Sequence, residues 1–268
     1  ECVQEGLPLN TVVSTRIFRK LTAEKNPDLQ GKILVVPGSA ADGAKMDALE
    51  AHLASGGKIL FYGVMQGAPE RVKALLQLRA DTAVSGDATV ENRMMGDVCP
   101  DELPSTVHIL PQYSCGGLTE VPSEGASFRT RATARCNGAE RILALSRRLE
   151  NGAEIGFVRA VLPASNDVWG GRNFDYAKDG EIFPAPRLLR DLAGEFGWQL
   201  GCALRSPESK VPRTSISRHD NAFFFSMYTP DTTAEMHVNT PYGVPLAIEG
   251  ETWIDESGNG VWHPEKSW

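Results

Sequence analysis

The chain has 268 residues, of which 41% are hydrophobic and 23% charged, a composition typical of soluble globular proteins and sufficient for one large or two smaller domains. Its formal net charge of −7, without a dense cluster of Lys and Arg, argues against a nucleic-acid-binding surface. No apolar run approaches the ~20 residues that span a bilayer. We therefore expect neither nucleic acid nor a membrane as a partner, and we predict a cytoplasmic protein.

Residues 32–62 predict a parallel β-α-β unit. Residues 32–36 are apolar and β-branched and end at Pro37-Gly38, which is typical of a buried parallel strand. A helix is predicted over residues 44–54, where apolar residues recur at i, i+3 and i+7 and a pair of glycines follows. Residues 58–62 are the next apolar strand. A strand, a helix and a strand at this spacing form a crossover connection.

The rest of the chain predicts few further helices and many strands. A helical turn is expected at residues 16–21, a helix after Pro69 and an amphipathic helix at residues 185–196. Residues 81–105 are polar and without periodicity, so we predict a loop there. The Asn151-Gly152 pair predicts a hairpin. Strands are predicted at residues 11–13, 107–110, 128–134, 142–149, 155–162, 222–228 and 234–240.

The pattern changes near residue 205. After Gly201 it is purely β, and apolar and polar residues alternate over residues 234–240, as in a sheet with one face in water. We therefore predict an α/β domain at residues 1–205, followed by an antiparallel β domain at residues 206–268.

The cysteines and histidines indicate neither a disulfide framework nor a metal site. The five cysteines lie far apart, at positions 2, 99, 115, 136 and 202, and form no CxxC pair. We expect free, mostly buried thiols, with one disulfide, such as Cys115 with Cys136, left open. The five histidines form no HxxxH or HExxH pair, so we predict no metal and no cofactor.

The segment Gly63-Val64-Met65-Gln66-Gly67 directly follows the second strand of the β-α-β unit and precedes a helix. This is the position of a nucleophile elbow, a strained turn that exposes a catalytic side chain. The segment resembles the elbow of class I glutamine amidotransferases, Gly-hydrophobic-Cys-x-Gly, in a flavodoxin-like fold. Met65 stands where that family has its cysteine, and a thioether cannot become a nucleophilic thiolate. The resemblance implies an inactive nucleophile elbow at Met65, and the alternative is an ordinary tight turn.

Longer stretches resemble the β-galactosidases of glycoside hydrolase family 42, which carry an amidotransferase-like domain without the nucleophile after their catalytic barrel. The resemblance rests on the strand, helix and strand of residues 34–62, the hairpin of residues 139–160 and the helix of residues 186–198. In that family the domain mediates trimer assembly and a small β domain follows it. The resemblance therefore implies carbohydrate metabolism and a homo-oligomer, with a trimer favoured. A related glycosidase family with the same accessory domain fits equally.

The chain departs from that family in two respects. It contains no catalytic barrel, so no residue inherits the roles of the family's catalytic glutamates, and we predict no catalytic residue. The β region after residue 205 is also longer and more aromatic. Because the chain does not begin with Met and its last residues resemble no natural end, we expect a piece of a longer protein. The partner would then be an associated catalytic barrel or further copies of the chain.

The loop at residues 163–181 is the candidate for contact with a sugar. Its aromatic and polar side chains can stack on a sugar ring and bind its hydroxyls. They are Trp169, Arg172, Asn173, Asp175 and Tyr176. The alternative is a surface loop whose Trp packs beneath it. Asp175 and Glu181 could also be a glycosidase acid and nucleophile, which requires carboxyl groups ~5–10 Å apart in a cleft.

These observations leave three functions. The first is the non-catalytic assembly and accessory region of a glycoside hydrolase, which holds subunits together and lends the loop to a neighbouring active site. The second is a carbohydrate-binding module after residue 205, where Trp253, Trp262 and Trp268 could form a platform. The third is a self-contained glycosidase that uses Asp175 and Glu181. We favour the first because the elbow has no cysteine although the α/β unit around it is well formed.

Overall fold

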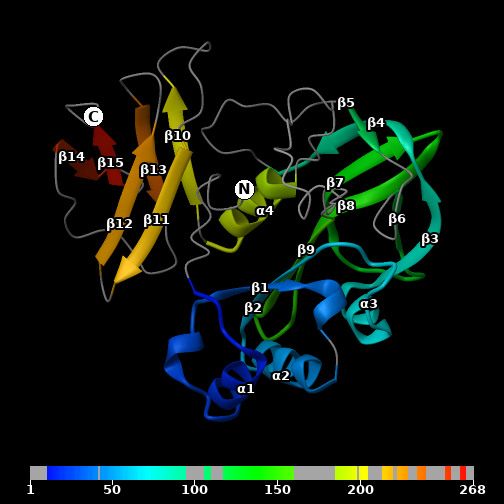
Figure 1. The fold of residues 1–268 in the computed structure, drawn as a ribbon, viewed down its shortest axis with the longest axis horizontal. Helices are drawn as coiled ribbons and strands as arrows, with labels where there is room; N and C mark the ends of the chain where they lie inside the picture. The colour runs from blue at the N-terminus through cyan, green and yellow to red at the C-terminus, as the bar shows by residue number, and fades with distance from the viewer. Residues whose placement is uncertain are drawn as a thin grey trace, which may run out of the picture. The chain divides into compact units, whose positions relative to one another are not determined.

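The computed structural model describes residues 11–41, 43–94, 106–109, 117–159 and 185–197, and beyond them the backbone of six strands (Figure 1). The chain divides into two compact units. The α/β unit comprises residues 14–94 and 103–188. The β unit comprises residues 1–13, 95–102 and 189–268.

A seven-stranded mixed sheet is the framework of the α/β unit, with the strand order β1-β2-β9-β8-β7-β4-β5. Three strands run parallel to one another, namely β1 (Ile33–Pro37), β2 (Lys58–Tyr62) and β9 (Glu154–Val158). The others pair antiparallel, namely β8 (Ala139–Arg148), β7 (Arg129–Cys136), β4 (Gly86–Asn92) and β5 (Thr106–Ile109). The predicted α/β class is therefore confirmed, with a sheet that is parallel in one part and antiparallel in the other.

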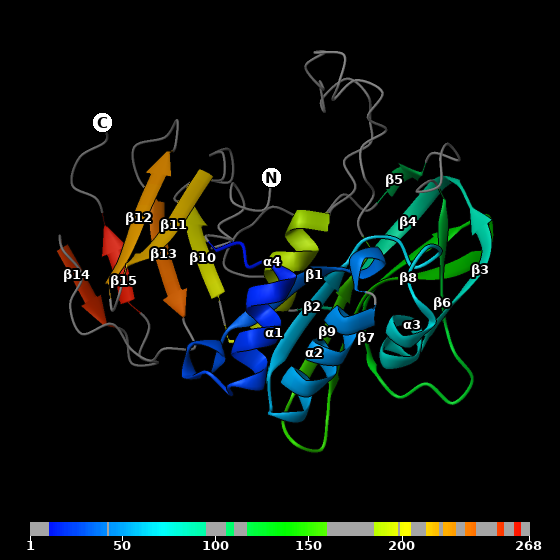
Figure 2. The same ribbon diagram turned by 60° about the horizontal axis from the view of Figure 1, so that its bottom comes forward.

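Two helices lie side by side on one face of the parallel strands (Figures 1 and 2). α2 (Gly43–Ala54) connects β1 to β2, and α1 (Thr15–Ala23) packs beside it. α1 begins after Ser14, whose hydroxyl accepts a hydrogen bond from the amide of Ile17 at 3.3 Å, as an N-cap does. Phe18 is the one buried residue of α1, whereas α2 buries several apolar side chains.

The core beneath these helices comes from alternate residues of the central strands. Ile59 and Phe61 of β2 and Ile155 and Phe157 of β9 are fully buried in it. The parallel register places Ile59 opposite Ile155 and Phe61 opposite Phe157. Because successive side chains of a strand point to opposite faces, this register gives the helices a continuous apolar surface. The predicted β-α-β unit is confirmed.

The predicted loop at residues 81–105 is wrong over its first part. α3 (Glu70–Leu76) ends at Gln77, whose left-handed backbone, with φ of 54°, stops the helix. The chain then enters β3 (Leu78–Val84) and β4. Five of the seven residues of β3 are exposed, so its sequence shows no apolar alternation. Backbone pairing with β6 (Leu118–Pro122), a distant segment, holds β3 in the strand conformation.

The predicted strand at residues 11–13 is also wrong. Val12 is 99% exposed and the segment belongs to neither a helix nor a strand, because β-branched residues without burial gain nothing from pairing. The helical turn at residues 16–21 is confirmed as part of α1. The strands predicted at residues 107–110, 128–134, 142–149 and 155–162 are confirmed as β5, β7, β8 and β9, although β9 ends at Val158 and residues 110 and 160–162 lie outside the described residues. The Asn151-Gly152 hairpin is confirmed between β8 and β9, with Gly152 at φ of 84°.

The β unit contains a four-stranded antiparallel sheet and a hairpin. The sheet has the order β10-β13-β15-β14, and β11 pairs with β12. Their bounds are β10 Gln199–Leu204, β11 Arg213–His219, β12 Ala222–Tyr228, β13 Ala234–Asn239, β14 Glu251–Ile254 and β15 Gly260–His263. The predicted strands at residues 222–228 and 234–240 are confirmed as β12 and β13. Because β10 pairs with β13, this sheet begins before residue 205. The domain boundary predicted near residue 205 stays a prediction.

The amphipathic helix predicted at residues 185–196 is confirmed as α4 (Ala185–Glu195). Its predicted apolar face is buried at Leu189, Leu192 and Phe196. Within the described residues, no helix is long and apolar enough to cross a bilayer.

His52, near the end of α2, is 3% exposed and meets the ring of Phe18 edge-on, with 6.1 Å between the ring centroids. A Cβ on Gly57 would lie 2.2 Å from Nε2 of His52, so the glycine makes room for the ring. This nitrogen finds no hydrogen-bond partner among the described residues. Burial lowers the pKa of His52, because desolvation disfavours the imidazolium ion. The folded protein therefore holds the ring neutral.

We predict that His52 makes the protein less stable in acid. Above its unfolded-state pKa of 6.5 the ring is neutral in both states. Below that value the unfolded chain binds the proton first, so the free energy of unfolding falls as the pH drops from 7.5 to 5.5. The variant His52→Leu cannot titrate and should lose less stability over this range in urea unfolding. An equal loss in wild type and variant would contradict the prediction.

Candidate functional site

The carboxyl ends of the three parallel strands lie at one edge of the sheet, which is where open α/β sheets place their ligand sites. Gly38 follows β1, the Met65 turn follows β2 and Arg159 follows β9. Glu120 of β6 reaches the same place, since its carboxylate contacts both Met65 and Arg159. We call Gly38, Met65, Glu120 and Arg159 the elbow cluster.

The turn after β2 has the backbone of a tight strand-to-helix connection, but the side chain of its central residue, Met65, points inward. Gly63 has φ of 110°, which side-chain-bearing residues rarely adopt, and its N–H donates to the carbonyl of Val158 at 3.1 Å. The N–H of Ala68 donates to the carbonyl of Met65 at 3.1 Å. Met65 itself is fully buried. A nucleophile elbow exposes the central side chain, and this turn does the opposite.

Met65 fills the space beside Gly38. A Cβ on Gly38 would lie 2.5 Å from Cε of Met65, so the methyl group occupies the volume that any larger residue at position 38 would need. The side chain of Met65 belongs to the same core cluster as Phe61 and Ala68. The side chain at position 65 therefore belongs to the core packing of this chain.

A fully buried ion pair completes the elbow cluster. Nε of Arg159 lies 3.0 Å from Oε2 of Glu120, and both side chains are 0% exposed. The carboxylate of Glu120 also accepts the N–H of Met65 at 3.0 Å, the N–H of Thr119 at 2.9 Å and the hydroxyl of Thr119 at 3.2 Å. Nη2 of Arg159 donates to the carbonyl of Gly117 at 2.6 Å. Buried charges are tolerated when they are paired and hydrogen-bonded in this way.

The elbow cluster contains no nucleophile. The thioether of Met65 has no proton to lose, and the hydroxyl of Thr119 is committed to Glu120. In the described residues, no group of three or more His, Cys, Asp or Glu is placed to hold a metal ion. The cluster instead ties β6 to the ends of β2 and β9, so its chemistry is that of a structural joint.

The residues predicted to contact a sugar cannot be placed. Trp169, Arg172, Asn173, Asp175 and Tyr176 lie outside the described residues, as does Glu181 of the alternative acid pair. Their segment follows Arg159 in the chain, so the buried ion pair anchors the residue from which it continues.

Of the cysteines, only the Cys136 side chain lies in the described part of the chain, and it is a free, buried thiol, as predicted. Its Sγ donates to the carbonyl of Ser85 at 3.1 Å, and burial raises the pKa of the thiol. Such a cysteine is a poor nucleophile.

The sequence did not reveal Glu120 and Arg159 as partners. One signal was available, because Arg159 interrupts the apolar run of residues 155–162, and an arginine in a buried strand needs a counter-charge. Nothing pointed to Glu120 as that counter-charge, since the two residues are 39 positions apart and β6 was not predicted.

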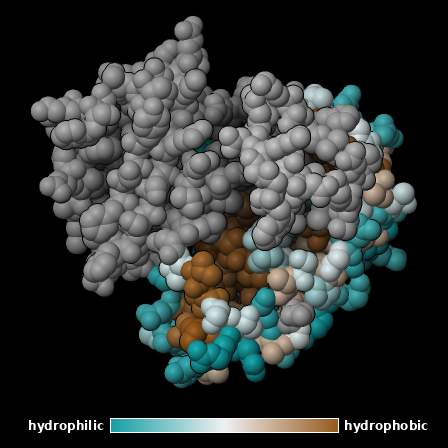
Figure 3. All heavy atoms as spheres, in the orientation of Figure 1, coloured by the Kyte–Doolittle hydropathy of each residue, from teal (hydrophilic) through white to brown (hydrophobic). Residues whose placement is uncertain are grey.

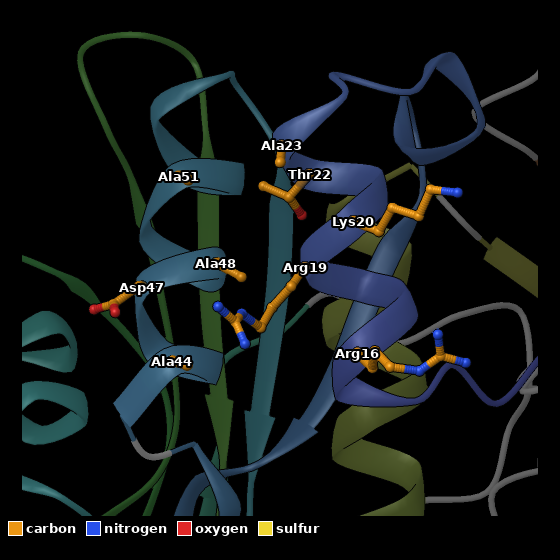
Figure 4. Close-up of a pocket in the computed structure, with 9 residues that line it drawn as sticks. All are labelled: Arg16, Arg19, Lys20, Thr22, Ala23, Ala44, Asp47, Ala48 and Ala51. Carbon is orange, nitrogen blue, oxygen red and sulfur yellow. The ribbon is translucent and has the colours of Figure 1, made fainter.

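A groove of about 450 Å³ lies between α1 and α2 (Figure 4). Alanines of α2 line one side, and Arg16, Arg19 and Lys20 of α1 line the other. Arg19 points toward α2, whereas Arg16 and Lys20 point away from it. Asp47 of α2 also lines the groove, and its carboxylate lies 2.8 Å from Nη1 of Arg71. The groove is therefore basic, and it holds no arrangement that points to a reaction.

Comparison with protein-family models gives no match, and neither a curated protein nor a solved structure is significantly similar to this chain.

We predict that positions 38 and 65 are energetically coupled. Gly38→Ala forces the buried Met65 to move and should lower the free energy of unfolding by about 1–3 kcal/mol. Met65→Ala leaves a cavity and should cost about 2–5 kcal/mol. The double variant should cost less than the sum, because shortening Met65 removes the clash. Urea unfolding of the four proteins measures the coupling.

Gly67→Ala is the matched control, since a Cβ there meets nothing within 4 Å. It should leave stability nearly unchanged. Strictly additive costs at positions 38 and 65 would show that Met65 does not fill the space beside Gly38.

Proposed function

We propose that this chain is the non-catalytic assembly and accessory region of a glycoside hydrolase that acts on O-glycosidic bonds. In this proposal the α/β unit is an amidotransferase-like, flavodoxin-like scaffold that has lost its chemistry. One observation carries the proposal: the turn at the position of a nucleophile elbow holds a fully buried methionine. A chain that kept catalysis at this turn would expose an ionisable nucleophile there.

The parallel half of the sheet supports the scaffold part of the proposal. β1, α2 and β2 form a crossover unit, and β9 continues the parallel order on the other side of β2. The elbow cluster lies at the carboxyl ends of these strands, as functional turns do in open α/β sheets. The antiparallel strands β8, β7, β4 and β5 extend the sheet beyond this unit.

The edge of the sheet supports the assembly part. Within the described chain β1 is the end strand, and all five of its residues, Ile33 to Pro37, are apolar and partly exposed. In the space-filling view, hydrophobic residues of the described chain gather where β1 lies (Figure 3). Apolar edge strands pair with other chains unless a protein protects them. We propose a homo-oligomer, with a trimer favoured, or an associated catalytic barrel as the partner.

The assembly role predicts that the chain self-associates at micromolar concentration in sedimentation velocity experiments. A lysine at Ile33 places a charge on the apolar edge, so Ile33→Lys should raise the dissociation constant at least tenfold, since charged side chains block edge pairing. Thr106→Lys is the matched control, because it adds the same charge on the exposed Thr106 of β5, the other edge strand. Monomer at every concentration, in the chain and in any longer natural form, would rule out the assembly role.

Activity distinguishes the alternatives. The accessory region should not hydrolyse chromogenic glycosides by itself. Hydrolysis that disappears in Asp175→Asn would instead establish the self-contained glycosidase. Binding of oligosaccharides by an otherwise monomeric chain in calorimetry would favour the carbohydrate-binding module.

A further inference from the structure

We propose that the elbow cluster is an anion-binding site whose ligand is supplied by the chain itself, the carboxylate of Glu120, and that it takes acetate when this side chain is removed. The proposal does not depend on the glycoside hydrolase assignment. It concerns the donors around Glu120 and the chemical class of ligand that they accept.

Four donors from three parts of the chain converge on the carboxylate. Oε1 accepts the N–H of Met65 at 3.0 Å and the hydroxyl of Thr119 at 3.2 Å. Oε2 accepts the N–H of Thr119 at 2.9 Å and Nε–H of Arg159 at 3.0 Å. Each oxygen therefore has two donors, one of them a backbone amide. Amide groups and a guanidinium that surround one carboxylate are the groups that bind free anions in proteins.

The donors keep their positions through contacts that do not involve Glu120. Nη2 of Arg159 donates to the carbonyl of Gly117 at 2.6 Å, and its backbone N–H donates to the carbonyl of Leu143 at 2.7 Å. The Met65 turn is held by the hydrogen bond from Ala68 and by the packing of Met65 beside Gly38. Loss of the carboxylate would therefore leave a preformed site with the positive charge of Arg159.

The size of the site determines the ligand. Glu120→Ala removes one methylene carbon and the carboxyl group beyond Cβ, and acetate has the same number of carbon and oxygen atoms. Because Glu120, Met65 and Arg159 are all 0% exposed, a larger carboxylate such as benzoate does not fit. Chloride carries the charge but cannot engage two pairs of donors at once. The native chain, with Glu120 in place, is closed to all three.

The experiment compares the melting temperature of Glu120→Ala in sodium acetate, sodium chloride and sodium benzoate at equal ionic strength. For a dissociation constant on the order of 10 mM, 100 mM acetate should raise the melting temperature by about 3–6 °C over chloride. Wild type and Glu120→Gln, in which the site is filled, should show no acetate-specific rise. Glu120→Ala combined with Arg159→Met should also lose the response, because the charged donor is gone.

If Glu120→Ala does not melt cooperatively, its refolding yield is the measurement. Refolding from urea should yield more folded protein in acetate than in chloride, with the yield saturating as acetate rises. Equal yields in the two salts up to 500 mM, an equal rise with benzoate, or an acetate response that survives Arg159→Met would each overturn the proposal.

Discussion

The ion pair of Glu120 and Arg159 determines how the carboxyl edge of the sheet is built, because a buried carboxylate must have its lone pairs filled. The carboxylate of Glu120 accepts hydrogen bonds from the turn after β2, from its own strand β6 and from the residue after β9. Three segments that are far apart in sequence are thereby held at fixed distances. The ion pair adds little to the free energy of unfolding, because the cost of removing both charges from water largely offsets their attraction. Its main effect is to fix the positions of the three segments.

The same joint explains why the elbow has no chemistry. The N–H of Met65 is directed to Glu120, and the thioether packs beside Gly38. The backbone N–H of Met65 thus has a hydrogen-bond acceptor, and its side chain is packed in the core. Exposing Met65 to a substrate would break this hydrogen bond and remove the side chain from the core. The described residues of this turn therefore present no nucleophile toward solvent.

The outer layer of the α/β unit is less firmly built than this edge. α1 packs on α2 and buries one residue, Phe18, which meets the ring of His52, whose pKa is lowered by burial. Next to this layer, β1 leaves an apolar strand partly exposed at the end of the sheet. Regions with few buried contacts and an unprotected edge are where proteins change and associate.

The sequence by itself determined the β-α-β unit, the helices at α3 and α4, the hairpin at Asn151-Gly152 and the absence of a thiol at position 65, because each depends on local pattern or residue type. It could not indicate β3, whose exposed residues carry no apolar alternation and whose conformation comes from pairing with β6. Nor could it indicate that Glu120 and Arg159 meet, or that Met65 turns inward to Gly38. These features exist only when distant segments are brought together, since burial and charge pairing are properties of the tertiary structure.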